Sequence, residues 1–577
     1  MRQKNAGAGR LRTAFAAFSH PVELTEGKPW RVILLYAAPI ILSYYLQQIY
    51  TLTDAIICGQ VLTAEQVAGV NDTFPLTFIF LQFAFGCTAG FSVITAGCVG
   101  SRDARGVRRS FAAQIELSLV ISAFLTALSI LLLPQMLALI NVTPAHGEVY
   151  AAARTYCLII FIGTIAQIGY NLICGILRAF GDSFTPLLFL AISTALNVGL
   201  DLLFLVPLRM GPAGAAIATV MAQLLSLIGC TVYTLRKYPA LRPEREDWRV
   251  PMPALTAHIR QGVPLGLQFS ILAIGIIVMQ GAVVKFDLTA AGEMAAGTPA
   301  QNGFGAANKL LNFLMTAYNG LGSGLLGYNA QNYGRGDRAR IRRGTLQTFV
   351  MMLILTAAVL LCGGLLTLGG AYQHIFLSAD KISETSLRYG NTYILVDLAL
   401  FVILGALFVM RNAVQGISRP GYVLGAGIAE LIARMLICAF LPAVVNGGPV
   451  DNTASGAAFA AVCFGDPGAW IAADLVLADD ELATVVAAAE EGRRVYANIR
   501  RSVLDLFDAI AQERTLLLIV EDVHWADAAS WDVLRDMVEW CAGRRVLLLL
   551  TSRTGELRGA SVESLPVRLH ELAPIDE

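Results

Sequence analysis

The sequence predicts an all-α polytopic membrane protein that carries a small α/β segment at its C-terminal end. Hydrophobic residues make up 56% of the 577 residues and charged residues 15%, whereas a soluble domain is roughly 25% charged. The apolar residues form long stretches, several of which exceed the roughly 20 residues that cross a bilayer. The formal net charge is zero, which gives no sign of a nucleic-acid partner.

Twelve apolar stretches are candidates for transmembrane helices. They begin near residues 31, 72, 110, 149, 184, 212, 261, 304, 346, 390, 421 and 456. Basic residues are concentrated in loops 102–109, 236–249 and 335–343, whereas the loops near Thr63, Thr143 and Asp451 hold almost none. Because positively charged loops stay in the cytoplasm, we expect both ends of the membrane region to be cytoplasmic.

An internal repeat divides the spans into two halves. Residues 86–109 align with residues 320–343: three glycines match, and so does one aspartate (Gly86, Gly90, Gly100 and Asp103 with Gly320, Gly324, Gly334 and Asp337). Pro39 and Pro264 each open the first span of a half. Two halves with six spans each have the same orientation, so we expect two six-helix lobes with pseudo-two-fold symmetry.

These features divide the chain into six parts. They are a cytoplasmic N-terminal segment (1–30), an N-lobe with spans one to six (31–235), an inter-lobe linker (236–256), a C-lobe with spans seven to twelve (257–477) and two tail fragments (478–505 and 506–577). The ten cysteines form no CxxC pair or Cys/His cluster, so we expect no metal site.

Polar residues inside the N-lobe spans form a candidate ion-coupling site. Tyr50 and Asp54 share one face of the first span, and Asn197 and Asp201 repeat this spacing in the fifth. Thr219 follows a Gly/Ala-rich run in the sixth span, where helices can approach closely. Intramembrane charges usually mark a pathway or relay, although a lone aspartate can also pin a helix.

Together these groups predict a pocket with two carboxylates, an amide and two hydroxyls. Two neighbouring carboxylates in a low dielectric cannot both ionise cheaply, so the pocket can take up a proton. Its oxygen atoms also suit a hard cation such as Na⁺. Pro39, upstream in the first span, lacks a backbone donor and is a candidate hinge.

The order of these motifs resembles the multidrug and toxic compound extrusion (MATE) family over about residues 20–477. The matching features are YxxxD with an upstream proline, NxxxD in the fifth span, GxxGAAxAT in the sixth and the glycine-rich end of the eighth. The resemblance implies two lobes around a V-shaped cavity and export of drugs in exchange for H⁺ or Na⁺. The N-lobe coupling site of DinF-like members matches six positions here (Pro39, Tyr50, Asp54, Asn197, Asp201 and Thr219).

The C-lobe departs from this pattern. NorM-like members carry a glutamate in the seventh span, where this sequence has only Gln268 and Gln280. Asp397 in the tenth span is the nearest acidic residue, and Glu430 and Arg434 at i, i+4 in the eleventh predict an internal ion pair. We therefore expect coupling in the N-lobe and no C-lobe sodium site.

The tail resembles fragments of two ATPase families. Residues 472–501 resemble the P-type ATPase segment before the fifth membrane helix, and residues 509–556 resemble the Walker B region of STAND-type ATPases, with Glu521 and Asp522 as its acids. No GxxxxGK[ST] phosphate loop occurs in the chain, so we expect no nucleotide site.

We therefore expect a multi-pass transporter of the bacterial inner membrane rather than an enzyme. Its expected substrates are small organic cations or drugs, its coupling ion H⁺ or Na⁺, and its state a monomer without cofactors. Two alternatives remain open: a lipid-linked oligosaccharide flippase of the same superfamily, and an ATP-driven or ATP-regulated protein.

Overall fold

The computed structural model describes residues 20–140, 142–294, 297–377 and 382–477 of the membrane region. In the tail it describes residues 516–520, 538, 540, 541, 544 and 546–550. The chain divides into two compact units, Met1–Ala489 and Glu490–Glu577.

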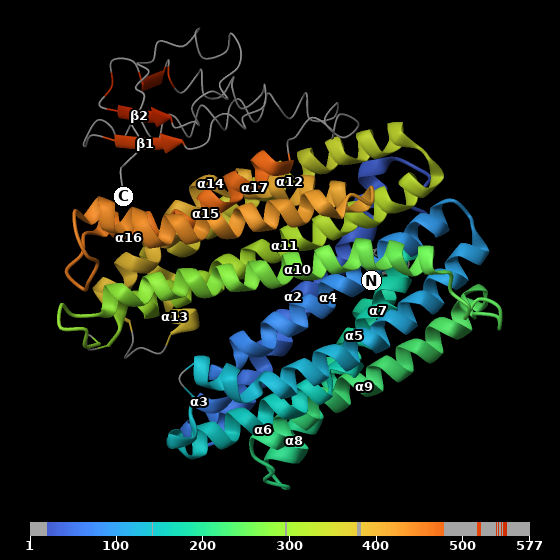
Figure 1. Ribbon diagram of the computed structural model, residues 1–577, viewed down its shortest axis with the longest axis horizontal. Helices are drawn as coiled ribbons and strands as arrows, with labels where there is room; N and C mark the ends of the chain where they lie inside the picture. Colours follow the sequence, from blue (N-terminus) through green and yellow to red (C-terminus); the bar gives the residue numbers. More distant parts are fainter. Residues whose placement is uncertain are drawn as a thin grey trace, which may run out of the picture. The chain divides into compact units, whose positions relative to one another are not determined.

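Helices build the described part of the first unit (Figure 1). They are α2 (Pro29–Val61), α3 (Ala64–Asp72), α4 (Phe74–Gly100), α5 (Ala104–Leu139), α6 (Glu148–Ile162), α7 (Thr164–Ala179), α8 (Phe184–Leu205), α9 (Pro212–Lys237), α10 (Met252–Val284), α11 (Pro299–Arg335), α12 (Arg338–Thr367), α13 (Ala371–Phe376), α14 (Glu384–Gly416), α15 (Pro420–Asn446), α16 (Gly456–Cys463) and α17 (Gly465–Leu477). Short 3-10 turns lie at Pro144–His146, Pro239–Leu241, Lys285–Asp287 and Leu368–Gly370.

The helices occupy all twelve positions at which the sequence predicts spans. Among the described residues, ten segments are long and apolar enough to cross a membrane, counting α3 with α4 and α16 with α17 as one segment each. An eleventh is the pair α6 and α7, which bends by 44° at Gly163. Several helices begin earlier than their apolar stretch, since α10 starts at Met252 and α12 at Arg338.

The one remaining predicted span, the eighth along the chain, is α11. It is long enough to cross a membrane but is less apolar than the other spans. Its 37 residues include many glycines and asparagines. The helix is buried along most of its length and packs against α2, α4, α12 and α14. Because other helices rather than lipid surround it, α11 does not need an apolar surface.

The repeat seen in the sequence reappears as a reciprocal packing of four helices. Gly86 in α4 lies against Gly266 in α10, two residues after Pro264. Its repeat mate Gly320 in α11 lies against Ile41 in α2, two residues after Pro39. The second helix of each half therefore packs on the first helix of the other half, as pseudo-two-fold symmetry requires.

The repeated aspartates have the same structural role in both halves. Asp103 caps α5 by accepting a hydrogen bond from the Gly106 amide at 2.8 Å, and Asp337 caps α12 by accepting one from the Arg340 amide at 2.9 Å. A side-chain acceptor at this position satisfies a free amide in the first helical turn. The sequence match between these residues is thus a match of helix starts.

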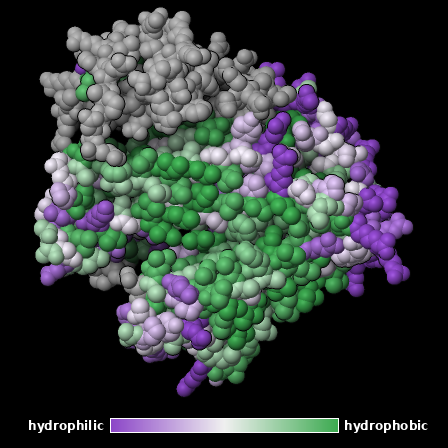
Figure 2. Space-filling view, viewed as in Figure 1, coloured by the Kyte–Doolittle hydropathy of each residue, from purple (hydrophilic) through white to green (hydrophobic). Residues whose placement is uncertain are grey.

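The three arginine-rich loops lie at one end of the molecule, which we call the basic end. Arg108 of α5 binds Asp247 of the segment between α9 and α10 at 2.7 Å. The N-terminal segment bridges the two halves there: the Val22 amide donates to Gly181, and Arg340 of α12 donates to the Gly27 carbonyl oxygen at 2.7 Å. Figure 2 shows hydrophilic side chains at this end and a broad apolar surface over the helices.

In the second unit the described residues include two strands. β1 (Leu516–Val520) pairs in parallel with β2 (Val546–Leu550), in a register that places Leu516 opposite Val546. The two strands coincide with two apolar runs in residues 509–556, the segment that resembles STAND-type ATPases. The fragment 478–505 and the acids Glu521 and Asp522 lie outside the described residues.

Candidate ion-coupling site

The N-lobe site is built from one face of α2 and one face of α8. Tyr50, Asp54 and Cys58 follow each other at one-turn intervals along α2, so they point in the same direction. Asn197 and Asp201 occupy the facing side of α8, which packs against α2, and both are fully buried. The predicted residues of the first and fifth spans are therefore brought together.

The two carboxyl groups are the centre of this site. Asp54 and Asp201 lie side by side, so that each acts directly on the other. Asn197 lies beside Asp201, and its amide nitrogen donates to the Thr219 hydroxyl of α9 at 3.5 Å. Tyr50 completes the group from the α2 side, next to Thr219.

Four oxygen atoms in this site are buried without a hydrogen-bond donor. They are both carboxyl oxygens of Asp201, Oδ1 of Asp54 and Oδ1 of Asn197. No Lys or Arg among the described residues acts on either carboxyl group. Buried polar oxygens are normally hydrogen-bonded, and a buried carboxylate without a partner is costly. These oxygens can therefore accept a proton or contact a cation.

Pro39 is separate from this cluster. It lies buried inside α2, about four turns before Asp54, and its carbonyl oxygen accepts a hydrogen bond from Ser43 at 2.8 Å. The residues on either side of it, Ala37 and Ile41, touch Gly324 and Gly320 of α11. Pro39 thus lies where α2 meets the other lobe, and any role in coupling must pass along the helix.

Two residues near the carboxyl pair were missed by the sequence interpretation. Tyr156 of α6 lies close to Asp54 and Tyr50, and Cys58 lies close to both aspartates. Cys58 continues the one-turn spacing that already joined Tyr50 to Asp54, so that spacing could have identified it. Tyr156 has no such signal, because its position depends on how the fourth span packs.

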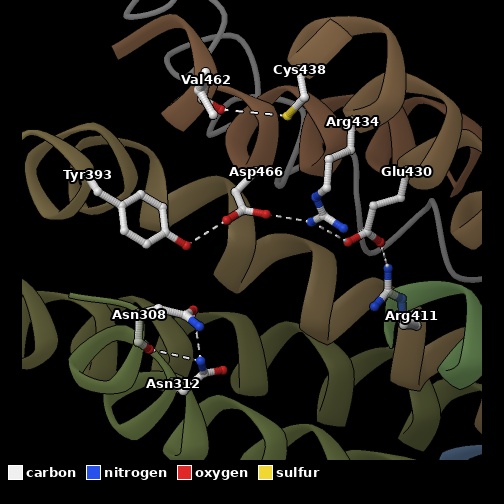
Figure 3. A network of polar contacts seen from close by, with 9 residues as sticks. All are labelled: Asn308, Asn312, Tyr393, Arg411, Glu430, Arg434, Cys438, Val462 and Asp466. Carbon is white, nitrogen blue, oxygen red and sulfur yellow. Dashed lines mark hydrogen bonds and ion pairs between the residues drawn. The ribbon is translucent and has the colours of Figure 1, made fainter. Parts of the chain in front are cut away.

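The C-lobe contains a chain of buried ion pairs (Figure 3). Glu430 and Arg434 form the predicted pair at 3.5 Å, but each has a shorter contact elsewhere. Arg434 binds Asp466 of α17 at 2.6 Å, and Arg411 of α14 binds Glu430 at 2.7 Å. The Tyr393 hydroxyl donates to Asp466 at 2.8 Å. The network therefore links α14, α15 and α17.

The remaining C-lobe candidates differ in their surroundings. Asp397 is buried near Asp466 and Arg434, and its Oδ1 has no hydrogen-bond partner. Gln268 is buried against Gly427 of α15, whereas Gln280 is exposed. Arg411 and Arg434 already neutralise the carboxylates with which they pair in this lobe. This distinguishes the C-lobe network from the carboxyl pair of the N-lobe. Among the described residues there is no group of three metal-ligating side chains.

The comparisons with known proteins agree with this architecture. Residues 39–203 match the MatE family model. The chain is 28% identical over 323 residues to the probable multidrug resistance protein YpnP of Bacillus subtilis, covering 55% of this chain and 68% of that protein. It is 25% identical over 430 residues to the FAD transporter of Shewanella oneidensis, covering 72% and 89% respectively.

A solved structure gives the same answer for the fold. A crystal structure of a MATE protein in complex with MaL6 superposes with a TM-score of 0.69 at 18% sequence identity, covering 82% of this chain and 99% of that one. The twelve helical positions, the repeat and the family match all fall within the membrane region. The family match, the similar relatives and the shared fold together support a transporter of the MATE type for that region of the chain.

Proposed function

We propose that this protein is a secondary active exporter of small amphipathic organic compounds that is driven by the exchange of H⁺ or Na⁺ at the N-lobe carboxyl pair. The observation that carries this proposal is the pairing of half-buried Asp54 with fully buried Asp201, in which three of the four carboxyl oxygens are buried without a donor. Relatives that are named multidrug resistance and multidrug export proteins support the substrate class.

Ion uptake would change the forces between α2 and α8. Without an ion, two adjacent carboxylates repel each other in a low dielectric. A proton shared between Asp54 and Asp201 converts this repulsion into a hydrogen bond and draws the two helices together. Because α2 also packs against α11 around Pro39, a movement of α2 reaches the other lobe. Alternating access would follow from that link.

The test is dye efflux from proteoliposomes with an imposed ion gradient. The conservative variants Asp54→Asn and Asp201→Asn should each reduce gradient-driven efflux to the background of empty vesicles. Asp72→Asn, which alters a carboxylate in α3, is the matched control and should retain the parental rate. If Asp54→Asn exports dye as well as the parent, the proposed coupling is wrong.

Separate pH and sodium gradients distinguish the two coupling ions. Efflux driven by a pH gradient without sodium identifies H⁺, and efflux that needs a sodium gradient identifies Na⁺. The oxygen-only composition of the site is compatible with both ions. In either case the same two aspartate variants should lose the response.

An anionic aromatic substrate is a second candidate, favoured by Arg178 in the last turn of α7. Side chains on a helix lean toward its N-terminus, which directs Arg178 toward Cys174 and Tyr170. Tyr36 and Tyr44 of α2 also surround it, and among the described residues Arg178 forms no ion pair. A guanidinium among phenol rings suits a flat anion, and one relative is named an FAD transporter.

The variant Arg178→Gln separates this candidate from the first. If flavin nucleotides are substrates, this variant should lose their efflux at least tenfold while retaining efflux of a cationic dye. Arg154→Gln, which changes an exposed arginine of α6, is the control. A lipid-linked pyrophosphate offered in the same assay tests the flippase alternative, and ATP hydrolysis by the purified protein tests the ATPase alternative.

The remaining expectations concern the setting of the transporter. We propose that it works as a monomer in the bacterial inner membrane, with the basic end and both termini in the cytoplasm. The positive-inside rule supports this orientation. Labelling of single exposed residues with a membrane-impermeant reagent tests it.

A further inference from the structure

A buried histidine joins the two lobes near the basic end. His258 lies in the second turn of α10 and is 2% exposed. Its Nε2 atom is 2.8 Å from the Ser110 hydroxyl of α5, which belongs to the other half of the repeat. Its ring also meets Phe91 of α4 edge to face, with centroids 6.1 Å apart. The imidazole is therefore enclosed between α4, α5 and α10.

The hydrogen bonds around this histidine run in one direction. Nδ1 is 2.8 Å from the Ala254 carbonyl oxygen, which can only accept, so Nδ1 carries the proton. In the neutral imidazole, Nε2 must then accept from Ser110. The Ser110 hydroxyl is in turn 2.7 Å from Thr95, and Thr95 accepts from the Gln114 amide. Each short contact in this chain thus has one donor and one acceptor, and the Gln114 amide also reaches the Ser110 hydroxyl at 3.4 Å.

Apart from the Ala254 carbonyl oxygen, no group in the described part of the chain around His258 would stabilise a positive charge. The facing groups are aromatic, hydroxyl or amide: Phe91 and Thr95 from α4, and Ser110 and Gln114 from α5. No charged group among the described residues acts on the imidazole. The nearest cation in α5, Arg109, faces Asp247, and Arg260 of α10 is exposed. On α14, the contact with this part of α10 is a backbone carbonyl oxygen, that of Gln415.

Adding a proton to Nε2 would disrupt this arrangement in two ways. It would create a buried cation without a counter-ion, which is costly in a low dielectric. It would also turn Nε2 from an acceptor into a donor, so the Ser110 hydroxyl would lose the acceptor of its own proton. The closed contact between α5 and α10 therefore accepts only the neutral imidazole.

The geometry points to His258 as a proton-operated latch that holds the two lobes together at the basic end and releases them when the imidazole is protonated. The small residues beside it make the contact close, since Gly262, one turn after His258, lies against Phe91 and the backbone of α4. Histidine is the side chain whose charge changes between about pH 5 and 8. The latch is separate from the coupling pair, which lies between α2 and α8.

This inference rests on the proposed function only in its last step, in which release of the latch opens the cytoplasmic side during export. The latch itself can be measured without transport. A pair of spin labels on the full chain, attached through noncanonical amino acids at Ala104 of α5 and Ala339 of α12, reports the distance between the lobes. Both positions are exposed and lie at the basic end.

The expected result is a shift in the distance distribution with pH. For the parent, a single short distance at pH 8 should give way to a longer one at pH 5.5, with at least a threefold rise in the long-distance fraction. His258→Gln keeps an acceptor and a donor but cannot be protonated, so it should remain short at both pH values. Ser110→Ala removes the bridge and should show the long distance even at pH 8. The control His374→Gln, at an exposed histidine of α13, should respond like the parent.

Two results would overturn the inference. The first is a parent whose distance does not change with pH, and the second is a parental response in His258→Gln. The variant Asp54→Asn, measured for both its pH response and its gradient-driven efflux, distinguishes failure of the latch from failure of the proposed function. If it loses the pH response while His258→Gln retains it, the carboxyl pair senses the proton and the latch does not exist. If Asp54→Asn loses only gradient-driven efflux, both proposals stand.

Discussion

Gly334 of α11 lies directly against the backbone of Gly97 in α4, where the two halves of the repeat cross. The contact is reciprocal, because Gly100 of α4 lies against the backbone of Gln331 in α11. At both positions an added Cβ atom would overlap main-chain atoms that no side-chain rotation can move. Two helices from different lobes can therefore approach closely only while these positions remain glycine.

We expect Gly334→Ala and Gly100→Ala to lower the thermal unfolding midpoint of the purified protein. Overpacking of this kind typically costs about 1–3 kcal/mol. Gly97→Ala is the matched control, because its Cβ would be 4.0 Å from its nearest neighbour, the Ala330 carbonyl oxygen. That variant should be neutral or slightly stabilised, since alanine favours a helix by about 1 kcal/mol over glycine. Equal midpoints for all three variants would contradict the close crossing.

The buried ion pairs of the C-lobe predict a strong effect of Arg434→Met. The change leaves Asp466 and Glu430 without the guanidinium that lies between them. Breaking a buried pair by removing one partner costs about 3–5 kcal/mol. The fraction of protein that elutes as a single species after heating should fall sharply. Adding Asp466→Asn to Arg434→Met should recover part of the loss, and a double variant no better than the single one would argue against direct pairing.

The linker between the lobes should detach at acidic pH. The Arg108 guanidinium beside Asp247 holds the pKa of that carboxyl below its usual range. A carboxyl with a lowered pKa stabilises the folded state above its ordinary pKa of about 3.9, and this contribution is lost as the pH falls below that value. Detachment can be followed by the fluorescence emission of the neighbouring Trp248, obtained as the difference between the parent and Trp248→Phe. This emission should be constant near neutral pH and change below about pH 4.

In Asp247→Asn the same emission should already have its low-pH character at pH 7. Glu246→Gln is the control, because Glu246 is exposed and its contact with Arg105 at 3.6 Å is solvated. An unchanged spectrum in Asp247→Asn would show that the linker is held by other contacts.

Removal of the tail should leave transport intact. The membrane region and the second unit are separate compact units, and the candidate coupling site lies wholly in the first. A chain that ends at Ala489 should therefore show the same gradient-driven efflux and the same unfolding midpoint as the full chain. Loss of efflux in this truncated chain, despite normal membrane insertion, would give the tail a function in transport.

The N-lobe site could be predicted because its signals are local. Tyr50 with Asp54, and Asn197 with Asp201, are each spaced by one helical turn, and each pair lies inside an apolar stretch where charge is rare. That the two pairs share one pocket was predicted from polar groups that need partners inside a membrane, and the family resemblance then matched the same positions. Tyr156 was missed because its proximity to Asp54 is a result of packing between spans.

The C-lobe network shows where local signals end. Glu430 and Arg434 were paired correctly from their spacing, but their shortest contacts reach Arg411 and Asp466 on other helices. Asp466 lies in a Gly-Asp-Pro-Gly stretch, which on its own is typical of a turn and gave no reason to place a charge inside a lobe. His258 was missed for a similar reason, since it lies where α10 extends beyond its apolar stretch.

The polarity of α11 has a consequence for biogenesis. A helix enters the membrane from the translocation channel according to its own hydrophobicity, and α11 is less apolar than the other spans. Its insertion should therefore depend more on neighbours that can shield it, of which α10 and α12 adjoin it in the chain and α2 and α4 are already synthesised. The helix at the centre of the finished transporter is thus the one whose entry into the bilayer depends most on the order of assembly.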